Sequence, residues 1–228
     1  MAAGQGTQTF EWQGKRIAIM NRKYDLSGLG FFGAGMIIFA GTDYFIDLDA
    51  GKVINFSGAL ISLAALAIML IGSFRTVNYN ECFKRSEIFV IIAIIADIAF
   101  MGSMIFGLRA GTASSGYAAL AIDLVLFASE LLSAAFMLGA CSKLAEQSGE
   151  ESLGIACTNT KTIFITVSII AFIIKPCIAF LPGNNNSAFL VLIIMSAVAV
   201  LGVNIMATMR FGNVCELLDG SRFNTENA

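Results

Sequence analysis

Runs of about twenty apolar residues, separated by short polar joints, fill the chain from Leu26 to Met209. The hydrocarbon core of a bilayer is about 30 Å thick, and a helix crosses it with roughly 20 apolar residues. Because the chain supplies such a run repeatedly, the sequence predicts an all-α, polytopic membrane protein. Only 13% of the residues are charged, against roughly 25% in a typical soluble domain, which agrees with this interpretation.

Six transmembrane helices are predicted, each centred on one apolar run. The predicted spans are Leu26–Thr42, Ile54–Phe74, Ile88–Leu108, Ala118–Ala140, Ile163–Leu181 and Ser187–Met209. The chain then divides into a polar N-terminal segment (1–25), a six-helix membrane domain (26–211) and a polar tail (212–228), which we expect to be helical at most around Val214–Leu218.

The joints between the spans alternate in length and charge. Short joints follow the first, third and fifth spans, and longer, more charged joints occupy residues 75–87 and 141–162. This alternation predicts three tight helical hairpins. Eleven of the 14 Lys and Arg residues lie on one side, two on the other, and Lys175 lies inside a span. The positive-inside rule therefore places both termini in the cytoplasm.

The first span and the segment before it carry two further predictions. Glycines make the first span a poor isolated helix, so we expect it to be packed inside the bundle, with Gly30 and Ala34 as a small-residue contact pair. In the preceding segment, Trp12, Lys15 and Arg16 favour an anchor in the membrane interface. A short β-hairpin turning at Gln13-Gly14 is the alternative.

The chain contains no histidine, which excludes bis-His haem, His-ligated zinc and the Ser-His triad. We recognise no catalytic motif, so the sequence leans against an enzyme and predicts no cofactor and no metal site. The net charge of −2 and the absence of a basic run give no support to nucleic-acid binding. The bilayer itself is the partner that the composition predicts.

Four ionisable residues lie within the apolar runs, where each charge costs about 2.5–3.5 kcal/mol. They are Asp97, Asp123, Glu130 and Lys175. Such residues usually face the interior of a bundle and have partners. Two weaker polar positions, Ser196 and Asn204 in the last span, are expected to form hydrogen bonds between helices.

The spacing of these residues predicts where they meet. Asp97 and Glu130 lie near the centres of their spans, and Asp123 precedes Glu130 by seven residues, which places both on one helix face about 10 Å apart. Lys175 should lie at a depth between these two acids. Pro176 follows it and removes a helical N–H, so we expect a helix break beside the lysine.

A buried site of three carboxyl groups and one lysine favours a protein of the permease or channel type. We expect the site to lie between the third, fourth and fifth spans and to be linked to proton or cation movement. The alternative is a non-transporting subunit that scaffolds or anchors a larger complex, in which the same residues only hold the helices together. A homo-oligomer or a membrane complex in an inner or plasma membrane fits either function.

Overall fold

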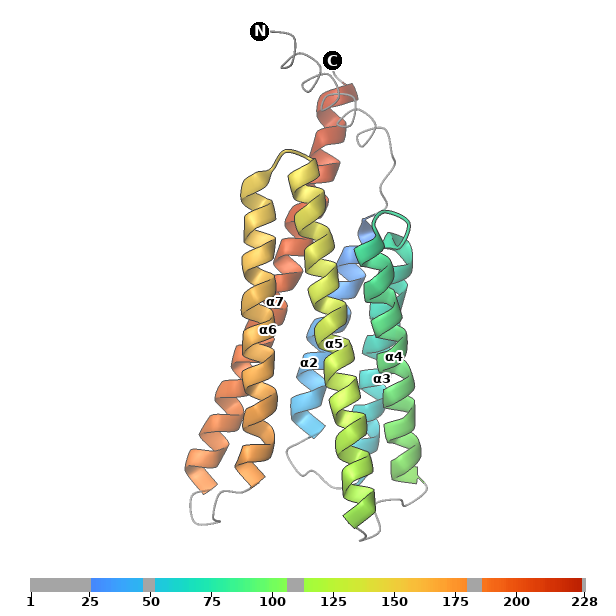
Figure 1. The fold of residues 1–228 in the computed structure, drawn as a ribbon, viewed down its shortest axis with the longest axis vertical. Helices are drawn as coiled ribbons and strands as arrows, with labels where there is room; N and C mark the ends of the chain where they lie inside the picture. The colour runs from blue at the N-terminus through green and yellow to red at the C-terminus, as the bar shows by residue number, and fades with distance from the viewer. Residues whose placement is uncertain (1–25, 47–51, 106–112, 180–185, 227–228) are drawn as a thin grey trace, which may run out of the picture.

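The computed structural model describes residues 26–46, 52–105, 113–179 and 186–226, and these residues form six α-helices (Figure 1). Their bounds are α2 (Ser27–Ile46), α3 (Lys52–Thr76), α4 (Glu81–Ile105), α5 (Ala113–Gln147), α6 (Glu151–Ala179) and α7 (Asn186–Glu226). The all-helical prediction is confirmed for this part of the chain.

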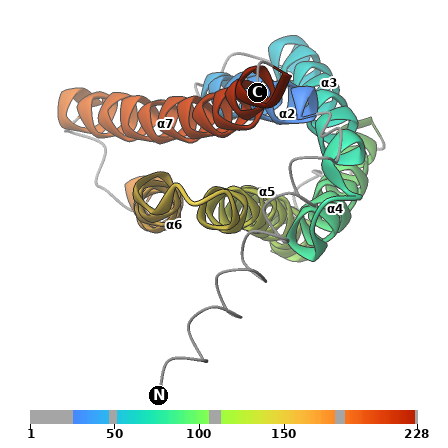
Figure 2. The same cartoon turned by 90° about the horizontal axis from the view of Figure 1, so that it is seen from above.

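Contacts between neighbouring helices close into a ring, and the view along the long axis shows α7 and α2 opposite α6 and α5 (Figure 2). Each helix packs against the next one in the chain, and α7 returns to contact α2. α5 also contacts α7 across the ring, so the bundle is flattened into two layers. Contact between the first and last of these helices makes the ring complete.

Four helices contain segments long and apolar enough to cross a membrane, judged by length and composition: Ser57–Thr76, Ala121–Gln147, Glu151–Ile174 and Val191–Leu218. The apolar part of α2, Ser27–Thr42, is shorter. On α4 the charged residues Arg85, Glu87 and Asp97 interrupt the apolar sequence. The structure thus agrees with a membrane protein.

A tight turn joins α5 to α6. The N–H of Glu150 donates to the carbonyl of Ala145 (3.0 Å), and the N–H of Gly149 donates to the carbonyl of Glu146 (3.0 Å). This is a Schellman motif, and it requires the left-handed φ of 86° that Gly149 adopts. The helices therefore extend through most of the predicted joint over residues 141–162, and only residues 148–150 lie outside them.

The turn between α3 and α4 is equally short. Asn80 caps α4, since its side-chain Oδ1 accepts a hydrogen bond of 3.0 Å from the N–H of Cys82. The predicted joint over residues 75–87 is thereby reduced to residues 77–80. The predicted end of the last helix is also wrong: α7 continues to Glu226, with Phe211 and Val214 fully buried.

Glycines allow the backbones of α2 and α3 to touch. A Cβ atom added at Gly72 would lie 2.6 Å from the backbone nitrogen of Phe32, and one added at Gly35 would lie 2.7 Å from the carbonyl oxygen of Ala65. The predicted contact pair of Gly30 and Ala34 is wrong. Both residues are exposed, and a Cβ at Gly30 would meet nothing within 4 Å.

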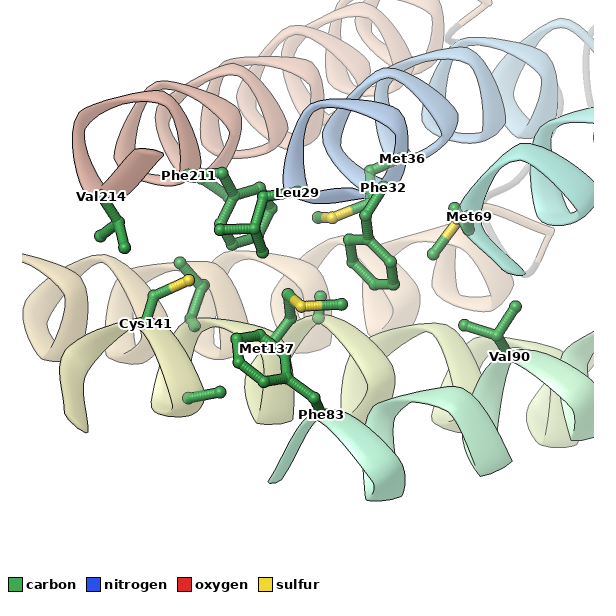
Figure 3. Close-up of a cluster of buried hydrophobic side chains, with 14 of the residues drawn as sticks. Leu29, Phe32, Met36, Met69, Phe83, Val90, Met137, Cys141, Phe211 and Val214 are labelled. Atoms are coloured by element: carbon green, nitrogen blue, oxygen red, sulfur yellow. The ribbon is translucent and has the colours of Figure 1, made fainter. Parts of the chain in front are cut away.

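Buried side chains are largest toward one end of the bundle. We name this the turn end, because it holds the α3–α4 and α5–α6 turns (Figure 1). There Leu29, Phe32 and Phe211 face Met137 and Cys141 of α5 (Figure 3). The rings of Phe32 and Phe211 meet edge to face with their centroids 6.0 Å apart. Packing of large apolar side chains therefore fills the interior at this end.

Away from the turn end, large buried side chains give way to small ones on five of the six helices. Leu66 gives way to Ser62 and Ala59 on α3, Val90 to Ala93, Ala96 and Asp97 on α4, Met137 to Ser133 and Ser129 on α5, Phe164 to Ser168 and Ala171 on α6, and Val203 to Ser196 on α7. We name this region the small-residue half. α2 departs from the trend because Phe39 is buried.

Candidate functional site

Asp97 lies on the buried face of α4. The side chains of Phe83, Val90, Ala93 and Asp97 recur at helical spacing and are all buried, with Asp97 only 2% exposed. The opposite face carries isoleucines, of which Ile95 is 62% exposed. α4 therefore turns an acid inward among buried apolar side chains and turns isoleucines outward.

Asp123 lies at the same height in the bundle as Asp97, on the neighbouring helix. The hydroxyl of Ser86 donates to the carbonyl of Ser133 (2.9 Å), which fixes the antiparallel register of α4 and α5. Asp97 follows Ser86 by eleven residues on α4, and the neighbour of Asp123 precedes Ser133 by eleven residues on α5. Because the two helices are antiparallel, these equal distances put Asp97 and Asp123 at the same height. Unlike Asp97, Asp123 is exposed.

Lys175 is placed near the same height by the register of α5 and α6. The rings of Phe127 and Phe172 stack with their centroids 4.1 Å apart. Lys175 follows Phe172 by three residues on α6, and the neighbour of Asp123 precedes Phe127 by three residues on α5. The backbone of Lys175 therefore lies near the height of Asp123. The side chains of Lys175 and Pro176 lie outside the described part of the structure. The helix itself continues through both positions to Ala179.

Glu130 lies closer to the turn end than the other two acids. It is half-buried and lies two turns, about 10 Å, along α5 from Asp123. Its helical position is in line with the buried residues Ala134 and Met137. The structure therefore brings Asp97, Asp123 and the backbone of Lys175 to one level, and places Glu130 between that level and the large apolar side chains.

Small polar side chains also lie in the bundle interior, and two of them, Ser129 and Ser168, lie near the level of Glu130. Ser62 on α3, Ser129 on α5 and Ser168 on α6 are all buried. These serines could not be selected from the sequence, because a single serine in an apolar run carries no sign of which way it points. Their helical spacing from the buried apolar residues of the same helix is the sequence feature that would indicate that they face the interior.

Among the described residues, Ser196 and Asn204 form no hydrogen bond between helices, so the prediction is not met there. Ser196 donates to the carbonyl of Ile193 (2.8 Å), and the amide nitrogen of Asn204 donates to the carbonyl of Val200 (2.9 Å), both within α7. Asn204 is fully buried, and among the described residues its Oδ1 accepts no hydrogen bond. Such an acceptor adds to the polar character of the interior.

The predicted interfacial anchor of Trp12, Lys15 and Arg16 lies outside the described residues. Within the described part of the chain, no group of three or more His, Cys, Asp or Glu side chains is placed to hold a metal ion. The four described cysteines, Cys82, Cys141, Cys157 and Cys215, are free thiols.

Comparisons of the chain with protein-family models, with curated proteins and with solved structures return no match.

Proposed function

We propose that this chain is an integral membrane protein of the permease or channel type, in which Asp97 is the central group of a proton- or cation-linked path. The observation that carries this proposal is the position of Asp97, which is 2% exposed and lies in the small-residue half of the bundle. A carboxyl group in such a place is costly unless it is paired, hydrated or protonated, which is why intramembrane acids mark ion and proton pathways.

The proposed path enters from the end opposite the turn end. The described buried side chains there are mostly Ala, Ser and Asp, which supports a hydrated path in this half of the bundle. Asp123, level with Asp97 on the neighbouring helix, would share the ion with it, and Lys175 on α6 would balance the charge. Glu130 would receive the proton or cation next, before the large apolar side chains of the turn end close the path.

The same proposal gives the orientation of the molecule. The three short joints of the sequence form three hairpins on the outer side, and the two turns and both termini lie in the cytoplasm, in accordance with the distribution of Lys and Arg. The large apolar side chains then form the closed, cytoplasmic end. An inner or plasma membrane and a homo-oligomeric assembly complete the proposal.

The proposal is tested by ion flux in liposomes that contain the purified protein. Proton, sodium and potassium movement is driven by an imposed potential and followed with ion-sensitive dyes. We expect flux with the parent protein, loss of flux with Asp97→Asn, and unchanged flux with Glu87→Gln. Glu87 is the matched control, because it is a half-buried acid on the same helix but lies near the turn end.

Two results would contradict the proposal. One is flux from the parent protein that does not exceed that of empty liposomes; the other is full flux in Asp97→Asn. If Asp97→Asn instead disrupts assembly on native gels and the parent carries no ion, the acid is a structural group. The non-transporting subunit would then be the better interpretation.

A further inference from the structure

Two arginines at the turn end rest on aromatic rings instead of pairing with carboxylates. The guanidinium carbon of Arg75 lies 4.8 Å from the centroid of the Phe31 ring, and that of Arg85 lies 5.9 Å from the centroid of Phe136. Among the described residues neither arginine forms an ion pair. Both arginines are exposed, so within the described part of the chain both positive charges are left without a carboxylate partner.

The Arg75 side chain is held in place by its contacts with α2. Its Cβ lies over Gly28, at 2.8 Å from where a glycine Cβ would be. Its Nη1 donates to the hydroxyl of Ser27 (2.9 Å). A guanidinium has five N–H donors, and among the described residues only this one hydrogen bond uses them, so the other donors are available to a ligand. A guanidinium that is held in place and has N–H donors available suits a phosphate group, which can accept two parallel hydrogen bonds.

Apolar side chains lie beside the guanidinium group of Arg75. Phe31 is 42% exposed and Phe74 is 54% exposed. Ile71, one turn further from the turn end on α3, is 48% exposed. The surface therefore changes from a cation to aromatic rings to aliphatic side chains along the bundle axis. A phospholipid has the same order of chemistry, from its phosphate to its acyl chains.

We propose that Arg75 and Arg85 bind the phosphate groups of anionic phospholipids in the leaflet at the turn end. The two arginines then mark the headgroup layer of the membrane. Asp97 follows Arg85 by twelve residues, which is about 18 Å along the helix axis. Half of a bilayer with its headgroups measures about 20–22 Å. Lipid binding at this level therefore places Asp97 close to the centre of the bilayer.

This inference does not depend on the proposed transport activity. It is tested with the purified full-length protein in detergent, by native mass spectrometry with dioleoyl phosphatidylglycerol and dioleoyl phosphatidylcholine as probes. We expect Arg75→Gln and Arg85→Gln each to weaken phosphatidylglycerol binding about fivefold, the size expected for one cation near an anionic membrane surface. Lys84→Gln is the matched control, since Lys84 is exposed and has no ring contact among the described residues.

Each outcome decides between specific and general attraction. A loss in Arg75→Gln or Arg85→Gln that clearly exceeds the loss in Lys84→Gln supports the proposal. Equal losses in all three variants would mean that only net charge matters, and unchanged binding would mean that neither arginine contacts lipid; either overturns it. Equal affinity for the two lipids, or displacement of the lipid by millimolar inorganic phosphate, would overturn the choice of an anionic phospholipid. Because the two arginines lie on different helices, misfolding of one variant leaves the other as a test.

Discussion

The contact of α2 with α3 predicts that one added methyl group will destabilise the protein. In Gly72→Ala the new Cβ would lie 2.5 Å from the carbonyl oxygen of Gly28 and 2.6 Å from the backbone nitrogen of Phe32. Both are backbone atoms, so no flexible side chain can move out of the way. Ordinary contacts are about 3.5–4.0 Å. The two helices must therefore separate by roughly 1 Å along this contact.

Overpacking of this kind typically costs about 1–3 kcal/mol. Replacement of Gly by Ala within a helix also gains up to about 1 kcal/mol from helix propensity, which would mask part of the loss. Gly41→Ala is the control for this gain, because Gly41 lies within α2 and a Cβ there would meet nothing within 4 Å. The difference between the two variants therefore isolates the cost of helix separation, at about 1–3 kcal/mol.

Thermal unfolding in detergent measures this difference. A thiol-reactive fluorescent dye reports unfolding, because Cys141 and Cys157 are fully buried in the folded protein. For a chain of about this size, 1 kcal/mol corresponds to a Tm shift of about 2–4 °C. We expect Gly72→Ala to melt about 2–12 °C below Gly41→Ala. If the two variants melt together, the close backbone contact of α2 and α3 does not contribute to stability.

Three further predictions follow from the turns and from the bundle interior. Gly149→Ala should destabilise the protein by about 1 kcal/mol, because the φ of 86° at Gly149 is unfavourable for a residue with a Cβ; urea unfolding that shows no loss would contradict this. Asn80→Ala should cost about 1 kcal/mol by the same measurement, whereas Asn80→Asp should retain the cap of α4. In the proposed orientation, Ser196→Cys should react with a membrane-impermeant thiosulfonate added outside, and Ala207→Cys, fully buried toward the turn end on the same helix, should not. Equal labelling of these two cysteines would show that the small-residue half is no more accessible to water than the turn end.

The sequence predicted that six helices form, because about twenty apolar residues in a row leave few alternatives in a membrane. It failed at their ends, for a physical reason. Polar residues were interpreted as joints, yet Thr160 and Thr162 lie within α6 and donate to carbonyl groups four residues earlier. A change to polar residues indicates where a helix leaves an apolar environment. It does not indicate where the helix stops.

The relations between helices could not be predicted from single-helix spacing. Asp123 and Glu130 lie seven residues apart, which fixes their common face on any helix. The level of Asp97 beside Asp123 instead depends on the Ser86–Ser133 hydrogen bond, which joins two helices. In the same way, the glycines of α2 showed that some close contact was possible. Only the structure shows which face of α2 packs on α3. That face contains Gly28 and Gly35 and does not contain Gly30.

The contact between α2 and α7 has a consequence for biosynthesis. A ribosome completes α2 and α3 early, and this pair can associate as soon as both have entered the bilayer. Leu29 and Phe32, however, stay uncovered on their other side until Phe211 has been translated, nearly the whole length of the chain later. A nascent chain that stalls before α7 is therefore an open arc of helices with exposed phenylalanine, a form that membrane chaperones and proteases can distinguish from the finished ring.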